Sequence, residues 1–279
     1  MDFYQLVFCH KNILDKLFMI YKNPQKIRLY YNEYIKNKLF KLKANKLIIS
    51  YPKSGRTWLY EILKLYAYKL FKEQNNHQQT IIKIQNTIIK FDHDCGDWVP
   101  YPYKNLNLKN KNIDKFKNII LIRDPREIIV SSWYHLTFRE KIYKKGINKF
   151  IKDEYLGISK IVSFYNLLDK HLSSNSLIIN YENLCKNIFE EIKKIIFHFE
   201  IEINNNLIIE CIDDCSFNKL QINEISNKKN IDKKSLKFRE GIVGNFSKDL
   251  SSENINYINY YMNQNLNYNF KKMLKLENI

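Results

Sequence analysis

Residues 47–58 constrain the fold more than any other part of the 279-residue chain. They begin with three consecutive apolar residues at positions 47–49, a run typical of a strand buried on both faces of a parallel sheet. Pro52 and Gly55 then mark a short loop, and a segment with helical apolar spacing follows. A loop between a strand and a helix presents backbone N–H groups at the positive end of the helix dipole. This stretch therefore predicts an anion-binding site.

The side chains of this loop suit an anion of the phosphate type. Lys53 brings a positive charge, and Ser54 and Thr57 bring hydroxyl donors. In the nucleoside triphosphate loop the lysine follows the last glycine, whereas Lys53 precedes Gly55 and enters from the strand side. A plain connecting turn would leave this concentration of donors unexplained. We therefore expect a P-loop-like site whose order of residues differs from that motif.

Segments typical of buried strands alternate with apolar-periodic helical segments along the rest of the chain. We expect further strands at residues 87–91, 118–122 and 177–180, and helices at residues 59–71, 188–199 and 252–274. Asp124 and Pro125 are typical of a helix N-cap and of the first helical residue. The alternation predicts an α/β fold, one domain over residues 1–279, with a mainly parallel central sheet flanked by helices on both faces.

Two segments depart from this pattern. Residues 1–45 predict a helical segment that packs on the domain. Charged residues interrupt its apolar part, so we expect no stable membrane insertion, although a place on a membrane surface is an alternative. Residues 223–237 are polar and lysine-rich, which predicts a mobile lid.

The composition limits the location and the partners of the protein. Five cysteines without paired spacing indicate a reducing compartment, so we expect a cytoplasmic protein. Cys211 and Cys215 lie one helical turn apart, but no compact Cys/His cluster accompanies them and we expect no metal. The net charge of +17 would attract an anionic donor, an acidic acceptor or nucleic acid.

A second candidate anion contact follows the strand expected at residues 118–122. Arg123 would lie at the carboxyl end of that strand, where parallel sheets bind ligands. Its planar guanidinium suits a phosphate, and Ser131 could donate a hydrogen bond from two turns along the next helix. The arginine alone is a weak signal, but paired with the Lys53 loop it becomes a strong one.

The order Pro-Lys-Ser-Gly-x-Thr-Trp at residues 52–58 closely resembles the 5′-phosphosulfate loop of the cytosolic-type sulfotransferases. These enzymes use 3′-phosphoadenosine 5′-phosphosulfate (PAPS) as donor, and in them a strand arginine and a helix serine grip the 3′-phosphate. Residues 238–246 resemble a late family motif, Arg-Lys-Gly-x-x-Gly-Asp-Trp, but Glu240 stands where the family usually has lysine. Lys237 and Lys248 lie nearby.

The resemblance implies a set of donor-binding residues. Trp58 and Phe217 would lie on the two faces of the adenine, and Tyr181 would touch the nucleotide. The full set comprises Lys53, Ser54, Gly55, Arg56, Thr57, Trp58, Arg123, Ser131, Tyr181, Ser216, Phe217, Arg239, Glu240 and Gly241.

Transfer of a sulfuryl group requires a base for the acceptor proton and donors for the developing negative charge. The family's catalytic histidine commonly follows a strand in the order Lys-Thr-His, which places His93 as the base and Lys53 as its partner in catalysis. Phe91 occupies the position of the assisting lysine, and Lys90 would point to the opposite side of the strand. His135 is the rival base, because it shares a helix face with Ser131.

The sequence thus predicts a sulfotransferase that moves the sulfuryl group of PAPS, in line, to a hydroxyl or amine of a small-molecule or carbohydrate acceptor. No metal and no nucleic-acid partner are expected, and the oligomeric state is left open. A P-loop kinase or other nucleotide-binding enzyme is the alternative, and a basic nucleic-acid-binding protein is a third reading.

Overall fold

The computed structural model of the chain describes residues 44–72, 80–98, 102–109, 113–227 and 232–276. The helical segment expected over residues 1–45 therefore lies, except for its last two residues, outside the described part of the chain. One five-stranded sheet, in the order β2-β3-β1-β4-β5, organises the described residues. The strands are β1 (Lys46–Ser50), β2 (Ile81–Ile84), β3 (Thr87–Asp92), β4 (Lys117–Ile122) and β5 (Ser176–Asn180).

Four of the five strands are parallel. β1 pairs with β3 and β4 on its two sides, and β4 also pairs with β5. The short strand β2 joins the sheet as the antiparallel partner of β3, through a two-residue turn at Gln85 and Asn86. The α/β prediction with a mainly parallel sheet is confirmed, whereas β2 was not anticipated.

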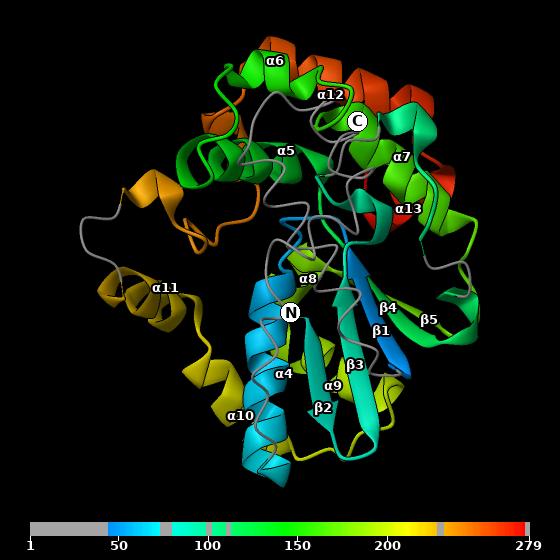
Figure 1. Cartoon of the computed structure of the whole chain (residues 1–279), viewed down its shortest axis with the longest axis vertical. Coiled ribbons are helices and arrows are strands. Elements are labelled where there is room, and N and C mark those ends of the chain that lie inside the picture. The colour runs from blue at the N-terminus through cyan, green and yellow to red at the C-terminus, as the bar shows by residue number, and fades with distance from the viewer. Residues whose placement is uncertain (1–43, 73–79, 99–101, 110–112, 228–231, 277–279) are drawn as a thin grey trace, which may run out of the picture.

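Helices cover both faces of the sheet (Figure 1). The described helices are α4 (Arg56–Phe71), α5 (Pro125–Tyr134), α6 (Ile147–Ile151), α7 (Ile158–Asp169), α8 (Tyr181–Lys186), α9 (Ile188–His198), α10 (Asn205–Asp214), α11 (Phe217–Ser226), α12 (Ser252–Asn265) and α13 (Tyr268–Met273). α10 packs against α4 and leads into α11, which extends away from the sheet (Figure 1).

The alternation of side chains along the strands divides the core in two. Leu47 and Ile49 of β1 pack with the helices α5, α7, α12 and α13 on one face. Ile48 packs with α4, α9 and α10 on the other. Because both faces of β1 and β4 are buried, these strands read as continuous apolar runs.

Short turns connect the helices near the carboxyl ends of the strands. α5 continues into a π-helical turn, η4 (His135–Arg139), and the 3₁₀ turns η5 (Lys233–Ser235) and η6 (Asn245–Lys248) follow α11. The lid predicted at residues 223–237 begins inside α11, so its first four residues are helical. Its mobility stays a prediction.

Candidate active site

The parallel strands end at one edge of the sheet, and each is followed by a residue singled out from the sequence. The loop with Lys53 follows β1, His93 follows β3, Arg123 follows β4 and Tyr181 follows β5. Since β1 lies between β3 and β4, its loop has His93 on one side and Arg123 on the other. This is the edge where parallel α/β sheets bind ligands.

The loop after β1 has an unusual backbone that its neighbours hold in place. Lys53 and Gly55 both have left-handed backbone angles, with φ of 72° and 94°. The guanidinium of Arg123 donates to the carbonyl oxygen of Lys53 at 2.8 Å and so supports the strained residue. A Cβ at Gly55 would lie 2.4 Å from the ring of Tyr181, so only glycine fits there.

The loop opens directly into helix α4 without a side-chain cap. The N-cap residue is Gly55, which has no side chain that could cap the helix. No acidic residue lies in the first turn either. The first backbone N–H groups of a helix have no partner within the helix. Arg56, Thr57 and Trp58 therefore present these groups at the positive end of the helix dipole, as the sequence predicted.

Lys53 lies in a strongly cationic environment. Burial lowers the pKa of its ammonium group to about 7, with further lowering by Lys237, Arg139 and Arg123, while Glu224 opposes them. Such a concentration of positive charge is unfavourable without an anion nearby. The site is therefore set up electrostatically to accept one.

His93 has a fixed orientation. Its Nδ1 lies 2.7 Å from the carbonyl oxygen of Ser50, the last residue of β1. A carbonyl oxygen only accepts, so Nδ1 carries the proton and the neutral ring has Nε2 as its acceptor. Burial, and next the charge of Arg56, lower the pKa of His93 to about 4. The imidazole is therefore neutral near pH 7.

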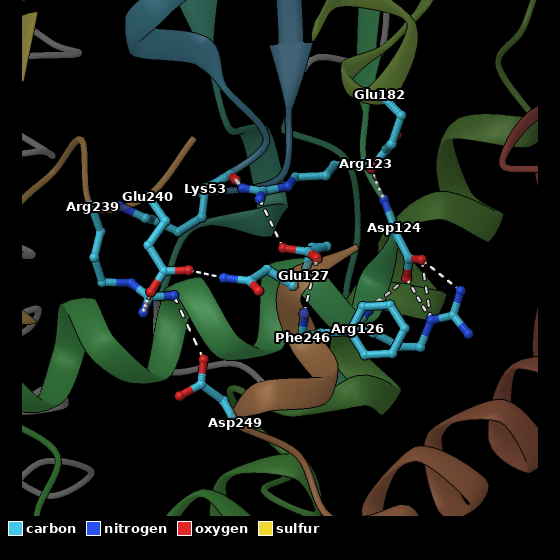
Figure 2. Close-up of polar contacts among 11 residues, drawn as sticks. Lys53, Arg123, Asp124, Arg126, Glu127, Glu182, Arg239, Glu240, Phe246 and Asp249 are labelled. Carbon is cyan, nitrogen blue, oxygen red and sulfur yellow. Dashed lines mark hydrogen bonds and ion pairs between the residues drawn. The ribbon is translucent and has the colours of Figure 1, made fainter. Parts of the chain in front are cut away.

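The side chain of Arg123 makes contacts of three kinds. Its guanidinium contacts the Lys53 carbonyl, stacks 4.4 Å from the centre of the Tyr181 ring and forms an ion pair with Glu127 at 3.0 Å. The second oxygen of Glu127 accepts from the backbone N–H of Phe246 at 3.2 Å. Glu127 thus links the arginine of the β4 end to the late segment of the chain (Figure 2).

Ser131 lies one turn beyond Glu127 on the same face of α5. Tyr134, in the next turn, supports the guanidinium of Arg239, which lies 3.9 Å from its ring centre. This face of α5 therefore contacts Arg123 through Glu127 at one end and Arg239 through Tyr134 at the other, and Ser131 lies between these two contacts. No side-chain hydrogen bond joins Ser131 to either arginine in the described structure.

Arg239 is occupied by two carboxylates. Its Nη1 lies 2.6 Å from Oε1 of Glu240, and its Nη2 lies 3.8 Å from Asp249 (Figure 2). Glu240 also accepts from the side chain of Asn245. The residue that departs from the family pattern thus pairs with the arginine expected to bind phosphate.

The aromatic residues expected at the adenine come together only in part. Trp58 meets Tyr181 edge to face at 6.3 Å and donates from its indole to the carbonyl of Cys215 at 2.9 Å. Ser216 follows as the N-cap residue of α11, without a side-chain capping bond. Phe217, however, packs on the backbone of Gly241, whose Cβ would lie 2.7 Å from the ring.

The rival base, His135, has a different environment from His93. Its ring is tilted against that of Trp98 with ring centres 4.7 Å apart, and its Nε2 lies 3.4 Å from Glu140. Burial, followed by the charges of Lys53, Arg139 and Lys237, lowers its pKa to about 2. His135 is therefore a weaker base than His93, which makes it the less suitable of the two for proton abstraction.

Three charged residues near Lys53 were not singled out as site residues from the sequence: Arg139, Glu224 and Lys237. Arg139 pairs with Glu224 at 2.6 Å although 85 positions separate them in the chain. No local pattern signals such a long-range pair. Only Lys237 was noted, for its closeness in sequence to the late motif.

The described part of the chain offers no set of three His, Cys, Asp or Glu side chains that could hold a metal ion. Within the same ranges, no helix is long and apolar enough to cross a membrane.

Comparison with known proteins identifies the family. A sequence model of the sulfotransferase domain matches residues 43–273, most of the chain. The chain belongs to the sulfotransferase family, whose members transfer sulfuryl groups. The loop after β1 and the arginine after β4, described above from their geometry, both lie within the matched region.

Individual relatives are distant. The chain is 21% identical to a rabbit (Oryctolagus cuniculus) amine sulfotransferase over 232 residues, which cover 74% of this chain and 75% of the relative. It is 26% identical to sulfotransferase 2A1 of Rattus norvegicus over 219 residues, covering 72% and 76%.

Solved structures share the fold. Mouse sulfotransferase SULT7A1, solved with 3′-phosphoadenosine 5′-phosphate (PAP), aligns with a TM-score of 0.59 and 18% identity over 84% of this chain and 89% of the mouse protein. Retinol dehydratase, solved with retinol and PAP, aligns with a TM-score of 0.61 and 15% identity over 85% and 86%.

Proposed function

We propose that this sulfotransferase uses PAPS as donor and transfers its sulfuryl group in line to a hydroxyl or amine, with His93 as general base. The observation that carries the proposal is the junction of the Lys53 loop with Arg123. The two lie side by side at the carboxyl edge of the sheet and are joined by the guanidinium–carbonyl hydrogen bond of 2.8 Å. One nucleotide with a phosphate at each end would use both.

The donor would bind with its 5′-phosphosulfate at the Lys53 loop. The N–H groups of the first turn of α4 and the ammonium of Lys53 would hold its oxygens. The 3′-phosphate would then meet Arg123 and Ser131, with Arg239 reaching it from the late segment. Trp58 and Tyr181 provide the aromatic surface nearest to the loop for the base.

In the reaction the acceptor oxygen or nitrogen would form a bond to sulfur as the bond from sulfur to the 5′-phosphate oxygen breaks. The electron pair of the broken bond stays on that phosphate oxygen, so negative charge grows at the Lys53 loop. The acceptor proton would pass to Nε2 of His93. Because Nδ1 carries the ring proton and donates it to the carbonyl oxygen of Ser50, Nε2 stays unprotonated and the ring keeps its orientation.

The acceptor pocket would involve the segment after His93 and the end of α5. Aromatic side chains gather there: Trp133, Tyr134 and Phe138 contact one another, and Trp98 contacts the ring of His135. An aromatic or apolar small molecule with a hydroxyl or amine is the acceptor we propose, ahead of a carbohydrate.

A cytoplasmic location accompanies this proposal. The four described cysteines are free thiols. Burial raises the pKa of the thiols of Cys95 and Cys215 to about 12, which keeps them in the protonated form. Such thiols are compatible with a reducing compartment.

The direct test is transfer of radiolabelled sulfur from PAPS to a panel of phenols, alcohols and amines. We expect labelled product with wild-type protein and a loss of turnover in Lys53→Met. Lys115→Met is the matched control, because Lys115 is exposed near the opposite end of the sheet, just before β4. Hydrolysis or transfer from ATP in the presence of Mg²⁺, without any use of PAPS, would favour the kinase alternative.

A further inference from the structure

Glu224 in helix α11 ties together three segments that are distant in the chain. Its Oε1 accepts from the guanidinium of Arg139, in η4, at 2.6 Å. Its Oε2 accepts from the backbone N–H groups of Lys237 and Phe238, at 2.7 and 3.1 Å. The carboxylate side chain is only 10% exposed. Burial alone would raise the pKa of Glu224, but these hydrogen bonds and the Arg139 charge outweigh it and lower the pKa.

Other contacts fix the same stretch of backbone. Gln221, one helical turn before Glu224, donates to the carbonyl oxygens of Phe238 and Arg239 at 2.6 and 2.9 Å. Arg139 also donates to the carbonyl of Ser235 at 3.3 Å. The backbone on both sides of Lys237 is therefore attached to α11 and to η4.

Arg139 and Lys237, which this network holds, both act electrostatically on Lys53. After burial, Lys237 and Arg139 are the groups that most lower the pKa of Lys53, ahead of Arg123. Both also act on His135, which lies at the start of η4. Lys237 is itself enclosed: burial, followed by Arg139 and Arg56, lowers its pKa to about 8.

Strand β3 lacks a lysine at the position where the family pattern has one. In the family pattern a lysine two positions before the histidine assists the loop lysine, but Phe91 stands there and is buried against Tyr60, with ring centres 5.2 Å apart. The neighbouring Lys90 forms an ion pair with Asp92 at 2.5 Å. β3 thus contributes no lysine at that position.

We propose that Lys237 and Arg139 contact the sulfuryl end of the donor in place of the missing strand lysine, and that Glu224 is the residue that positions them. The inference rests on the proposed function. As the sulfur–oxygen bond to the 5′-phosphate breaks and the bond to the acceptor forms, the two cations would stabilise the charge on the sulfuryl oxygens.

The first test concerns the assembly itself and needs no donor. The rate of acylation of Lys53, followed by mass spectrometry as a function of pH, reports the pKa of its amine. The charged and titratable groups that act electrostatically with Lys53 are Lys237, Arg139, Arg123, Glu224 and the weakly basic His135. Removing one cation should raise the pKa of Lys53 from about 7 toward the ordinary lysine value.

We therefore expect Lys237→Met to raise the pKa of Lys53. The control Lys233→Met removes an exposed lysine from the same segment and should leave that pKa unchanged. Lys237→Gln serves as a second variant if the methionine disturbs folding. An unchanged Lys53 pKa in the Lys237 variants would overturn the proposal.

The second test separates sulfuryl contact from nucleotide binding. Because PAP lacks the sulfuryl group, Lys237→Met should lower kcat by about 10²-fold, the typical loss for one donor to a developing charge, and change PAP affinity by no more than about 3-fold. Equal losses in kcat and PAP affinity would contradict the assignment, as would an activity equal to that of Lys233→Met.

If Glu224 positions Lys237, the losses in kcat caused by substituting each residue should not be additive. In a double-mutant cycle, Lys237→Met should cost much less in kcat when Glu224→Gln is already present. Strictly additive losses would overturn this part of the proposal. If wild-type protein neither binds PAP nor transfers sulfur, the proposed function fails instead, whatever the acylation experiment shows for Lys53.

Discussion

Arg239 and Glu240 are neighbours in the chain, and their side chains form an ion pair with 2.6 Å between Nη1 and Oε1. Tyr134 and Asp249 complete the surroundings of the guanidinium, and Tyr134 is itself hydrogen-bonded to Asp249 at 2.7 Å. A phosphate that binds Arg239 must compete with the Glu240 carboxylate. Where the family usually adds a positive charge, this chain has a negative one that occupies the arginine.

Removing this competitor should strengthen donor binding. We expect Glu240→Gln to lower the Kd for PAP by about 2- to 5-fold, because a partly exposed ion pair is worth roughly 0.2–1 kcal/mol. Titration calorimetry on both proteins measures the difference. Glu253→Gln, an exposed change in the first turn of α12, is the control with the same charge change. Weaker binding in Glu240→Gln would mean that Glu240 helps the donor.

His93→Ala should lower kcat by about 10²- to 10⁴-fold, the range expected for a general base. His171→Ala changes a histidine in the turn after α7, away from the carboxyl ends of the strands, and should keep the activity. Turnover of His93→Ala equal to wild type would remove this residue from the mechanism.

The pH dependence gives a second signature of His93. Burial and Arg56 lower its pKa to about 4, so the basic form predominates above that value and is lost as the pH falls through it. In kcat/KM we therefore expect an acid limb near pH 4 and no histidine limb near pH 6.5. A limb near 6.5 that disappears in His93→Ala would contradict the buried environment described for this ring.

Donor binding should take up a proton in weakly alkaline solution. The pKa of free Lys53 is about 7, so near pH 8 its amine is mostly neutral, whereas a bound phosphate favours the charged form. Calorimetry in buffers of different ionisation enthalpy should show a greater proton uptake per PAP near pH 8 than near pH 5. Equal uptake at both values would show that Lys53 does not titrate in this range.

Glu127 should be important for stability. Its ion pair with Arg123 is largely buried, with side-chain exposures of 7% and 12%. Glu127→Ala would leave Arg123 without this partner, and we expect a loss of about 3–5 kcal/mol in the free energy of unfolding. Urea denaturation measures it, with Glu190→Ala in the exposed first turn of α9 as control. A loss below about 1 kcal/mol would show that other groups stabilise Arg123 as well.

The sequence was informative where the fold depends on local pattern. The apolar runs of β1 and β4 and the Asp124-Pro125 helix start appear in the structure as predicted, with Asp124 accepting from the backbone N–H of Arg126. Strand β2 was missed, because four residues paired antiparallel at the sheet edge carry little periodic signal.

The site was predictable only in its contiguous parts. The Lys53 loop is a short motif whose backbone requirements are visible in Gly55. The Arg139–Glu224 pair, by contrast, forms between a turn after α5 and helix α11, and depends on tertiary packing. The pairing of Arg239 with Glu240 and Asp249 likewise needed side-chain geometry, although the unusual acid at position 240 was visible beforehand.

The most direct test of the central claim is calorimetric titration of the wild-type protein and Arg123→Ala with PAP, beside AMP and ATP. We expect wild-type protein to bind PAP much more tightly than AMP or ATP, and Arg123→Ala to lose roughly 1.5–3 kcal/mol of that binding, the worth of a hydrogen bond to a charged group. No preference for PAP, or equal affinity of the two proteins for it, would contradict the account of the Lys53 loop and Arg123 as one donor site.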